Sequence, residues 1–138
     1  MSVLGTKTYA LALGLIAIIA APISWAATPC DGIDRKITPQ RQTAIAPHIA
    51  KQLQVKKADV LKSFQYRGWS IFYVETHETD EAYVFYSGDP LKSAYVTLWG
   101  GAARKDEERE IRQWTLKNAP GIPNRLAGCF AWHVTNEP

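Results

Sequence analysis

The sequence predicts a small α+β domain in which an antiparallel sheet of about four strands packs against helices. Three observations support this prediction. A helix-start signal precedes apolar residues at spacing four, a central stretch combines aromatic and β-branched residues with frequent turns, and the two cysteines lie far apart in the chain. We expect the element order α-β-β-β-α-β, closed by one disulfide.

The start of the chain has the layout of a secretory signal peptide. Lys7 supplies a positive charge, and an uncharged apolar run extends from Tyr9 to Ala21. Ser24 and Ala26 place small residues at the positions that precede a cleavage site after Ala26. Because the run is shorter than the ~20 residues that span a bilayer, we expect cleavage and no stable membrane anchor.

Cleavage would leave residues 27–138 as a single domain in the periplasm or outside the cell. The full chain carries 16 basic and 13 acidic residues, and its basic residues never occur in runs longer than a pair. So weak a positive balance argues against nucleic acid as a partner.

The two cysteines, Cys30 and Cys129, favour an intramolecular disulfide. An exported chain reaches an oxidising compartment, where an even number of cysteines indicates pairing. The bond would tie the start of the domain to its last segment. A redox role is disfavoured because these cysteines do not form a C-x-x-C motif, and two distant cysteines alone make a poor metal site.

The first predicted element is a helix that starts after Thr38. Thr38 can cap the helix and Pro39 suits its first position. The apolar residues that line one face at spacing four are Ile45, Ile49 and Leu53. Pro47 leaves two alternatives open, a kinked helix or a helix that begins late with Pro47 in its first turn.

Three strands are expected next, at about 63–76, 82–87 and 94–99. Their aromatic and β-branched residues alternate between two faces, and Gly68 is interpreted as a bulge in the long first strand. A helix follows at about 106–118. The segment 127–135 alternates again, with Phe130, Trp132 and Val134 on one side, which predicts a fourth strand.

A cluster of polar side chains occupies the connection between the first two predicted strands. Glu75, His77 and Asp80 are candidate metal ligands, although their spacing matches neither H-E-x-x-H nor a calcium loop. A charged hairpin connection is expected in any case, since charge runs are usually solvated. The cluster therefore has three interpretations: a solvated tip, a metal site, or an acidic patch that faces a partner.

Aromatic residues provide the candidate binding surface. Rings fall on both alternating faces of the predicted strands, whereas one helix layer covers only one face of a sheet. An exposed set of rings would suit a protein or sugar partner. The residues proposed for it are Trp69, Tyr73, Tyr86, Tyr95 and Trp99. Alternatively, the second helix and the N-terminal arm cover the other face.

Two segments, WSIFYVETHETDEAYVFYSGDP and WTLKNAPGIPNRLAGCFAWHV, resemble a family of small exported bacterial proteins that carries no assigned activity. The likeness covers roughly residues 37–135. It implies a bacterial cell-envelope setting. It supplies no catalytic residue for this chain.

Three classes of function follow. The first is a non-catalytic envelope protein that binds another protein, as an inhibitor or immunity-type protein does. The second is a binder of a small ligand or glycan on the aromatic face. The third is a metal-assisted enzyme built on Glu75 and His77. The sequence contains no G-x-S-x-G, S-x-x-K, zincin or P-loop motif and indicates no cofactor, which disfavours the third class.

Overall fold

A four-stranded antiparallel sheet forms the centre of the computed structural model, which describes residues 2, 5, 20–22 and 25–137. The strands lie side by side in chain order: β1 (Asp59–Tyr66), β2 (Trp69–Glu75), β3 (Ala82–Ser87) and β4 (Thr97–Gly100). The helices are α1 (Pro39–Leu53), α2 (Glu108–Asn118) and α3 (Asn124–Asn136), and a short 3-10 turn, η1 (Lys105–Glu107), precedes α2.

The α+β class, the four-stranded antiparallel sheet and the disulfide are therefore confirmed. The element order is α-β-β-β-β-α-α and not the expected α-β-β-β-α-β. Most of the predicted signal peptide lies outside the described residues. Within the described part of the chain, no helix is long and apolar enough to cross a membrane.

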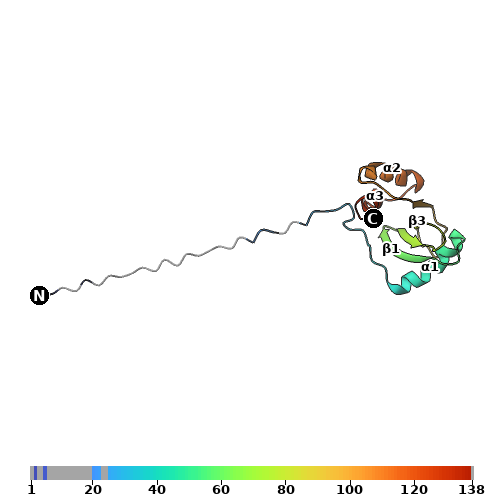
Figure 1. Ribbon diagram of the computed structural model, residues 1–138, viewed down its shortest axis with the longest axis horizontal. Coiled ribbons are helices and arrows are strands. Elements are labelled where there is room, and N and C mark those ends of the chain that lie inside the picture. The colour runs from blue at the N-terminus through green and yellow to red at the C-terminus, as the bar shows by residue number, and fades with distance from the viewer. Residues whose placement is uncertain (1, 3–4, 6–19, 23–24, 138) are drawn as a thin grey trace.

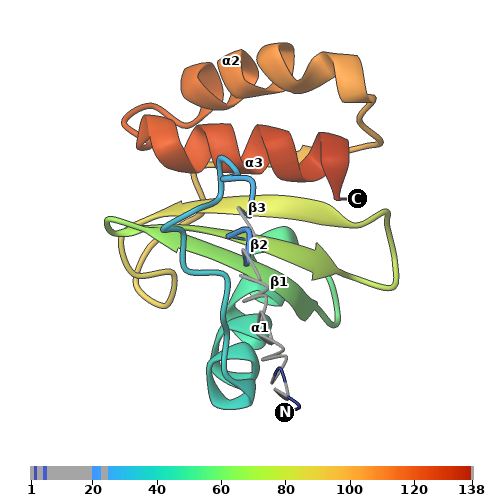
Figure 2. The ribbon, with the colours of Figure 1, turned by 90° about the vertical axis from the view of Figure 1, so that its left-hand side faces the viewer.

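Helices cover both faces of the sheet. Figures 1 and 2 show α1 on one face and the α2–α3 pair on the other. Side chains of successive strand residues point to opposite faces. Thus Ile71 packs in the cluster beneath α3, whereas its neighbour Phe72 packs in the cluster against α1. The alternative in which both sheet faces are covered is the one observed.

Helix α1 starts where the sequence predicted. The Thr38 side chain accepts a hydrogen bond from the Arg41 amide at 3.2 Å, which satisfies one amide that the helix cannot pair internally. Pro47 lies inside the helix, so a late start is wrong. The helix ends at Leu53 and is capped by Gln54, whose left-handed backbone (φ 58°) lets its amide donate to carbonyls of the last turn.

The long first strand is in fact two strands joined by a tight turn. Arg67 and Gly68 have φ values of 47° and 80°, and Tyr66 pairs directly with Trp69. Two successive positive φ values match the right-handed twist of a hairpin. Gly68 is thus a turn residue, not the predicted bulge.

The predicted strand at 127–135 is a helix. Leu126, Phe130 and Val134 recur at spacing four and bury one face of α3 against the sheet. Cys129 is also buried there and forms the disulfide with Cys30, which fastens the N-terminal segment to α3. Alternating rings suggested a strand because part of this segment fits both periods.

Candidate functional site

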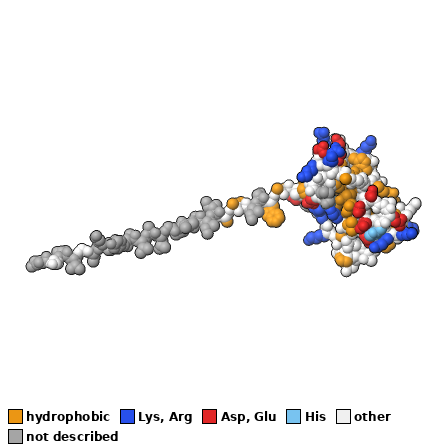
Figure 3. Space-filling view, in the orientation of Figure 1, with side chains coloured by type: hydrophobic (Ala, Val, Ile, Leu, Met, Phe, Trp, Pro, Cys, Tyr) orange, Lys and Arg blue, Asp and Glu red, His pale blue; other side chains and the backbone are white. Residues whose placement is uncertain are grey.

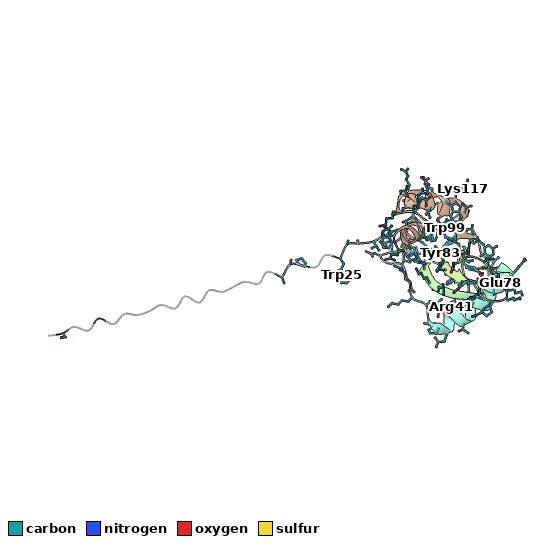
Figure 4. All side chains as sticks on the ribbon, in the orientation of Figure 1. Trp25, Arg41, Glu78, Tyr83, Trp99 and Lys117 are labelled. Atoms are coloured by element: carbon teal, nitrogen blue, oxygen red, sulfur yellow. A yellow bond between two sulfur atoms is a disulfide. The ribbon has the colours of Figure 1, made fainter. Side chains whose placement is uncertain are left out.

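A hollow of about 470 Å³ opens between the end of the sheet and α3. Three aromatic rings form its wall, those of Tyr73, Tyr83 and Trp99. The segment 101–103 and Val134 complete the apolar lining, and two carboxylates stand at the rim. Figure 4 shows Tyr83 and Trp99 close together, and in Figure 3 hydrophobic side chains gather on this face with acidic side chains beside them.

Strand pairing places the three rings in a row. Tyr73 of β2 is paired with Tyr83 of β3, and Tyr83 is paired with Trp99 of β4. The Tyr73 and Tyr83 rings stack with centroids 4.5 Å apart, and the Trp99 ring is tilted 6.0 Å from that of Tyr83. Cross-strand rings of this kind stabilise a sheet and fix one another in place. We call these three residues the aromatic row.

The centre of the aromatic row is rigidly supported. Tyr83 is buried and meets the Phe130 ring of α3 edge-on at 5.1 Å. Burial raises the pKa of Tyr83 strongly. Burial also raises the pKa of Tyr73, with the Glu81 and Glu75 carboxylates adding to the effect. Both phenols therefore stay neutral near pH 7 and offer packing surface and hydrogen bonds, not basic catalysis.

The rim of the hollow is acidic. Asp80 and Glu81 are exposed and line the hollow. Among the described residues, neither carboxylate lies within ion-pair distance of a basic side chain. Unpaired carboxylates beside partly exposed rings favour a cationic group at this place.

A second hollow of about 500 Å³ lies on the α1 side of the same sheet end. Leu53, Val55 and Leu98 supply its apolar wall. It shares its acidic rim, Asp80 and Glu81, with the first hollow. The two hollows therefore flank the end of β4, one on each face of the sheet.

The candidate metal ligands are only partly brought together. His77 Nε2 lies 2.6 Å from Asp59 Oδ2, and its Nδ1 lies 3.5 Å from Glu75 Oε1. Hydrogen bonds from His77 and then Lys57 lower the pKa of Asp59. Asp80 lines the two hollows instead. Within the described part of the chain, no group of three or more His, Cys, Asp or Glu residues could hold a metal ion.

The expected reversal of the chain at the hairpin is confirmed, and the residues at its tip, 77–81, are exposed. Sequence reasoning missed Asp59, because its approach to His77 depends on the pairing of β1 with β2.

The five aromatic residues proposed as a binding surface do not lie together. Trp69 and Tyr86 are buried in opposite clusters, and Tyr95 packs against the α1-side cluster. Only Tyr73 and Trp99 line the hollow beneath α3. Tyr83, between them, was missed, and only knowledge of the strand register could have identified it.

One buried histidine lies behind the hollow. His133 of α3 has 1% of its surface exposed, and its ring lies 4.8 Å from that of Phe64. Its Nδ1 lies 3.2 Å from a Glu137 carboxylate oxygen, and its Nε2 lies 3.4 Å from Lys62 Nζ. Burial lowers the pKa of His133, so the ring is neutral at pH 7. It is a core residue and not a ligand in the hollow.

No known protein family, curated protein or solved structure matches this chain.

Proposed function

We propose that this chain is an exported, non-catalytic protein of the bacterial cell envelope, periplasmic or secreted, that binds another protein at the hollow beneath α3. The observation that carries the proposal is the aromatic row with its two unpaired carboxylates. The disulfide is compatible with export, since such bonds persist in oxidising compartments.

The chemistry of the hollow supports a protein partner. Tyr and Trp are enriched among residues that dominate binding energy, because they bury a large area while retaining a polar atom. Tyr73 and Trp99 are only partly buried, so a partner can still cover them. The sheet fixes them in advance, which reduces the entropy that binding costs. An inhibitor or immunity-type protein needs such a preformed surface.

A small ligand or glycan is the second candidate. A volume of about 470 Å³ falls within the range of ligand cavities, and rings suit sugars and flat molecules. The continuation of the acidic rim into a second hollow favours an extended partner over a compact one.

Crosslinked capture from the native cell envelope tests the proposal. The bait is the protein purified after export with its disulfide formed. We expect a stable partner, and we expect Trp99→Ala to reduce its recovery by about tenfold or more, as central interface aromatics do. Trp132→Ala is the matched control, since Trp132 packs on the same cluster without lining the hollow.

A thermal melt of each variant separates lost binding from lost folding. Glu81→Lys supplies a second test that leaves the core intact. Equal capture by wild type, Trp99→Ala and Glu81→Lys would contradict a protein partner at this hollow. A shift in tryptophan fluorescence with a defined oligosaccharide, abolished in Trp99→Phe, would instead favour the ligand-binding alternative.

A further inference from the structure

The two edges of the sheet are built differently. The β1 edge has a register irregularity between Val60 and Lys62, and an isolated bridge joins Asp34 to Gln65 beside it. Irregular register, an edge lysine and a covering segment are devices that stop a sheet edge from pairing with another chain. This edge is therefore protected.

The β4 edge is only four residues long, but it has neither an irregular register nor a charged side chain. Its sequence, TLWG, contains no charged residue and no proline. Within the described residues, β4 is the last strand of the sheet and pairs with β3 alone. Leu98 at its centre leaves 41% of its surface exposed. An edge of this kind offers unpaired backbone groups to an incoming strand.

The two hollows are placed to receive the side chains of such a strand. Successive side chains of a strand point to opposite faces of its sheet. Trp99 faces the hollow beneath α3, and Leu98 faces the hollow on the α1 side. A strand added beside β4 would therefore send alternate side chains toward the two hollows.

The charge of the residues that line the two hollows indicates which charge the incoming segment should carry. Asp80 and Glu81 are the charged residues that line the two hollows, and neither hollow is lined by a lysine or arginine among the described residues. The whole chain, by contrast, has a formal net charge of +3. This local reversal of sign favours a basic partner segment.

We infer that the β4 edge accepts an extended, basic segment of the partner protein as an added strand. Apolar side chains of that segment enter the two hollows, and a lysine or arginine lies beside Asp80 and Glu81. This inference rests on the proposed function and specifies its binding mode. A second copy of β4 fits less well as the added strand, because its sequence, TLWG, contains no basic residue.

Synthetic peptides of roughly ten residues, about two average strand lengths, test this mode directly. The probe is a pool in which apolar residues alternate with threonine and lysine. The first control is the same pool with glutamate in place of lysine. Two further controls keep lysine and have every second backbone amide N-methylated, one starting at the odd positions and one at the even positions. We expect the lysine pool to bind, and the glutamate pool and at least one N-methylated register to bind at least about tenfold more weakly, since each loses charge or backbone pairing.

Two leucines provide matched variants of the protein. Leu98→Lys places a like charge against the basic segment, and we expect it to weaken peptide binding by about tenfold or more. Leu61→Lys makes the same change on the protected β1 edge, where the leucine is 46% exposed, and we expect no effect. Amide signals of β4 that shift on binding would locate the peptide.

The outcomes separate this inference from the proposed function. If Leu98→Lys and Leu61→Lys bind alike, or if both N-methylated registers bind as well as the parent pool, strand addition is wrong. The proposed function still stands in that case if Trp99→Ala abolishes capture from the envelope. Sedimentation showing a dimer that Leu98→Lys converts to a monomer would also overturn the inference, in favour of self-pairing.

Discussion

The two faces of the sheet carry cores of different construction. On the α1 face, Ile45 and Ile49 pack on strand residues such as Val74, and the cluster is mostly aliphatic. On the opposite face, α3 covers a larger cluster that includes the disulfide, Phe130 and the buried His133. One face is covered by one helix, whereas the other is covered by two helices and carries the disulfide.

Neither face is fully closed by its helices, because a hollow remains on each face at the same end of the sheet. On the α3 face, Tyr73 and Trp99 stay partly exposed where the hollow opens. Aliphatic side chains on the α1 face pack to full burial at its centre. Rings therefore wall the hollow on one face, and aliphatic side chains wall the hollow on the other. If the two faces are independent, a substitution on one face should leave the structure and stability of the other unchanged.

Removal of the disulfide has the largest expected effect. The double variant Cys30→Ala with Cys129→Ala opens a loop of sequence separation 99 and should lower the free energy of unfolding by ~4–5 kcal/mol in the chain-entropy model. Urea denaturation measures this loss. Hydrogen exchange should rise more in α3 than in α1, because the bond fastens α3 alone. An equal rise in both helices would contradict the separation of the faces.

Core truncations come next. Ile49→Ala on the α1 face and Leu126→Ala on the α3 face each remove a fully buried side chain, and each should cost ~2–5 kcal/mol. Leu126→Ala should be the costlier change, since the disulfide limits the movement of α3 into the cavity. Urea denaturation of the two variants gives the comparison. A larger loss for Ile49→Ala would show that the disulfide does not restrain the repacking.

The cap of α1 has a smaller effect. Thr38→Ala removes the hydrogen bond to the Arg41 amide and should cost about 1 kcal/mol, while Thr38→Ser should retain most of the stability. The near-ultraviolet circular dichroism of the aromatic row should not change, because α1 lies on the opposite face. A changed signal would mean that the faces are coupled.

The smallest expected effect is the contribution of His133 to the pH dependence of the free energy of unfolding. Burial, and then the Lys62 and Arg35 charges, lower its pKa below 6.5, while the hydrogen bond to Glu137 opposes them. The unfolded state therefore binds a proton more readily, and stability falls as pH drops below about 6.5 toward the folded pKa. Denaturation of His133→Gln over this pH range should show a flatter slope. If the free energy of unfolding of His133→Gln changed with pH as steeply as that of the wild type, the pH dependence would come from other groups.

The sequence predicted an element best where neighbouring residues alone determine where that element begins. Thr38 and Pro39 located the start of α1 because capping involves neighbouring residues only. The disulfide was predictable because the chain has only two cysteines, which allow a single intramolecular pairing. The segment 127–135 was assigned wrongly because Phe130 and Val134 fit both a strand and a helix, and the decisive residue, Leu126, stood outside the assumed strand.

The site was less predictable than the fold because it depends on pairing between strands. Tyr73 and Trp99 were among the candidates, but their partnership with Tyr83 is a matter of register. Trp69 and Tyr86 are equally aromatic and alternate in the same pattern, yet they are buried. Burial is decided by which helix lies above each residue, and the sequence pattern of a strand does not contain that information.

The covalent link between Cys30 and Cys129 also determines how the protein bears mechanical load. Their Cα atoms are 4.4 Å apart, so a pull on the two ends passes through sulfur and bypasses the sheet. On the C-terminal side the tension acts on the half of α3 that follows Cys129, which carries the buried Phe130 and Val134. The strands between the two cysteines therefore carry none of this load, whereas the C-terminal half of α3, with the Val134 that lines the hollow, carries it in full.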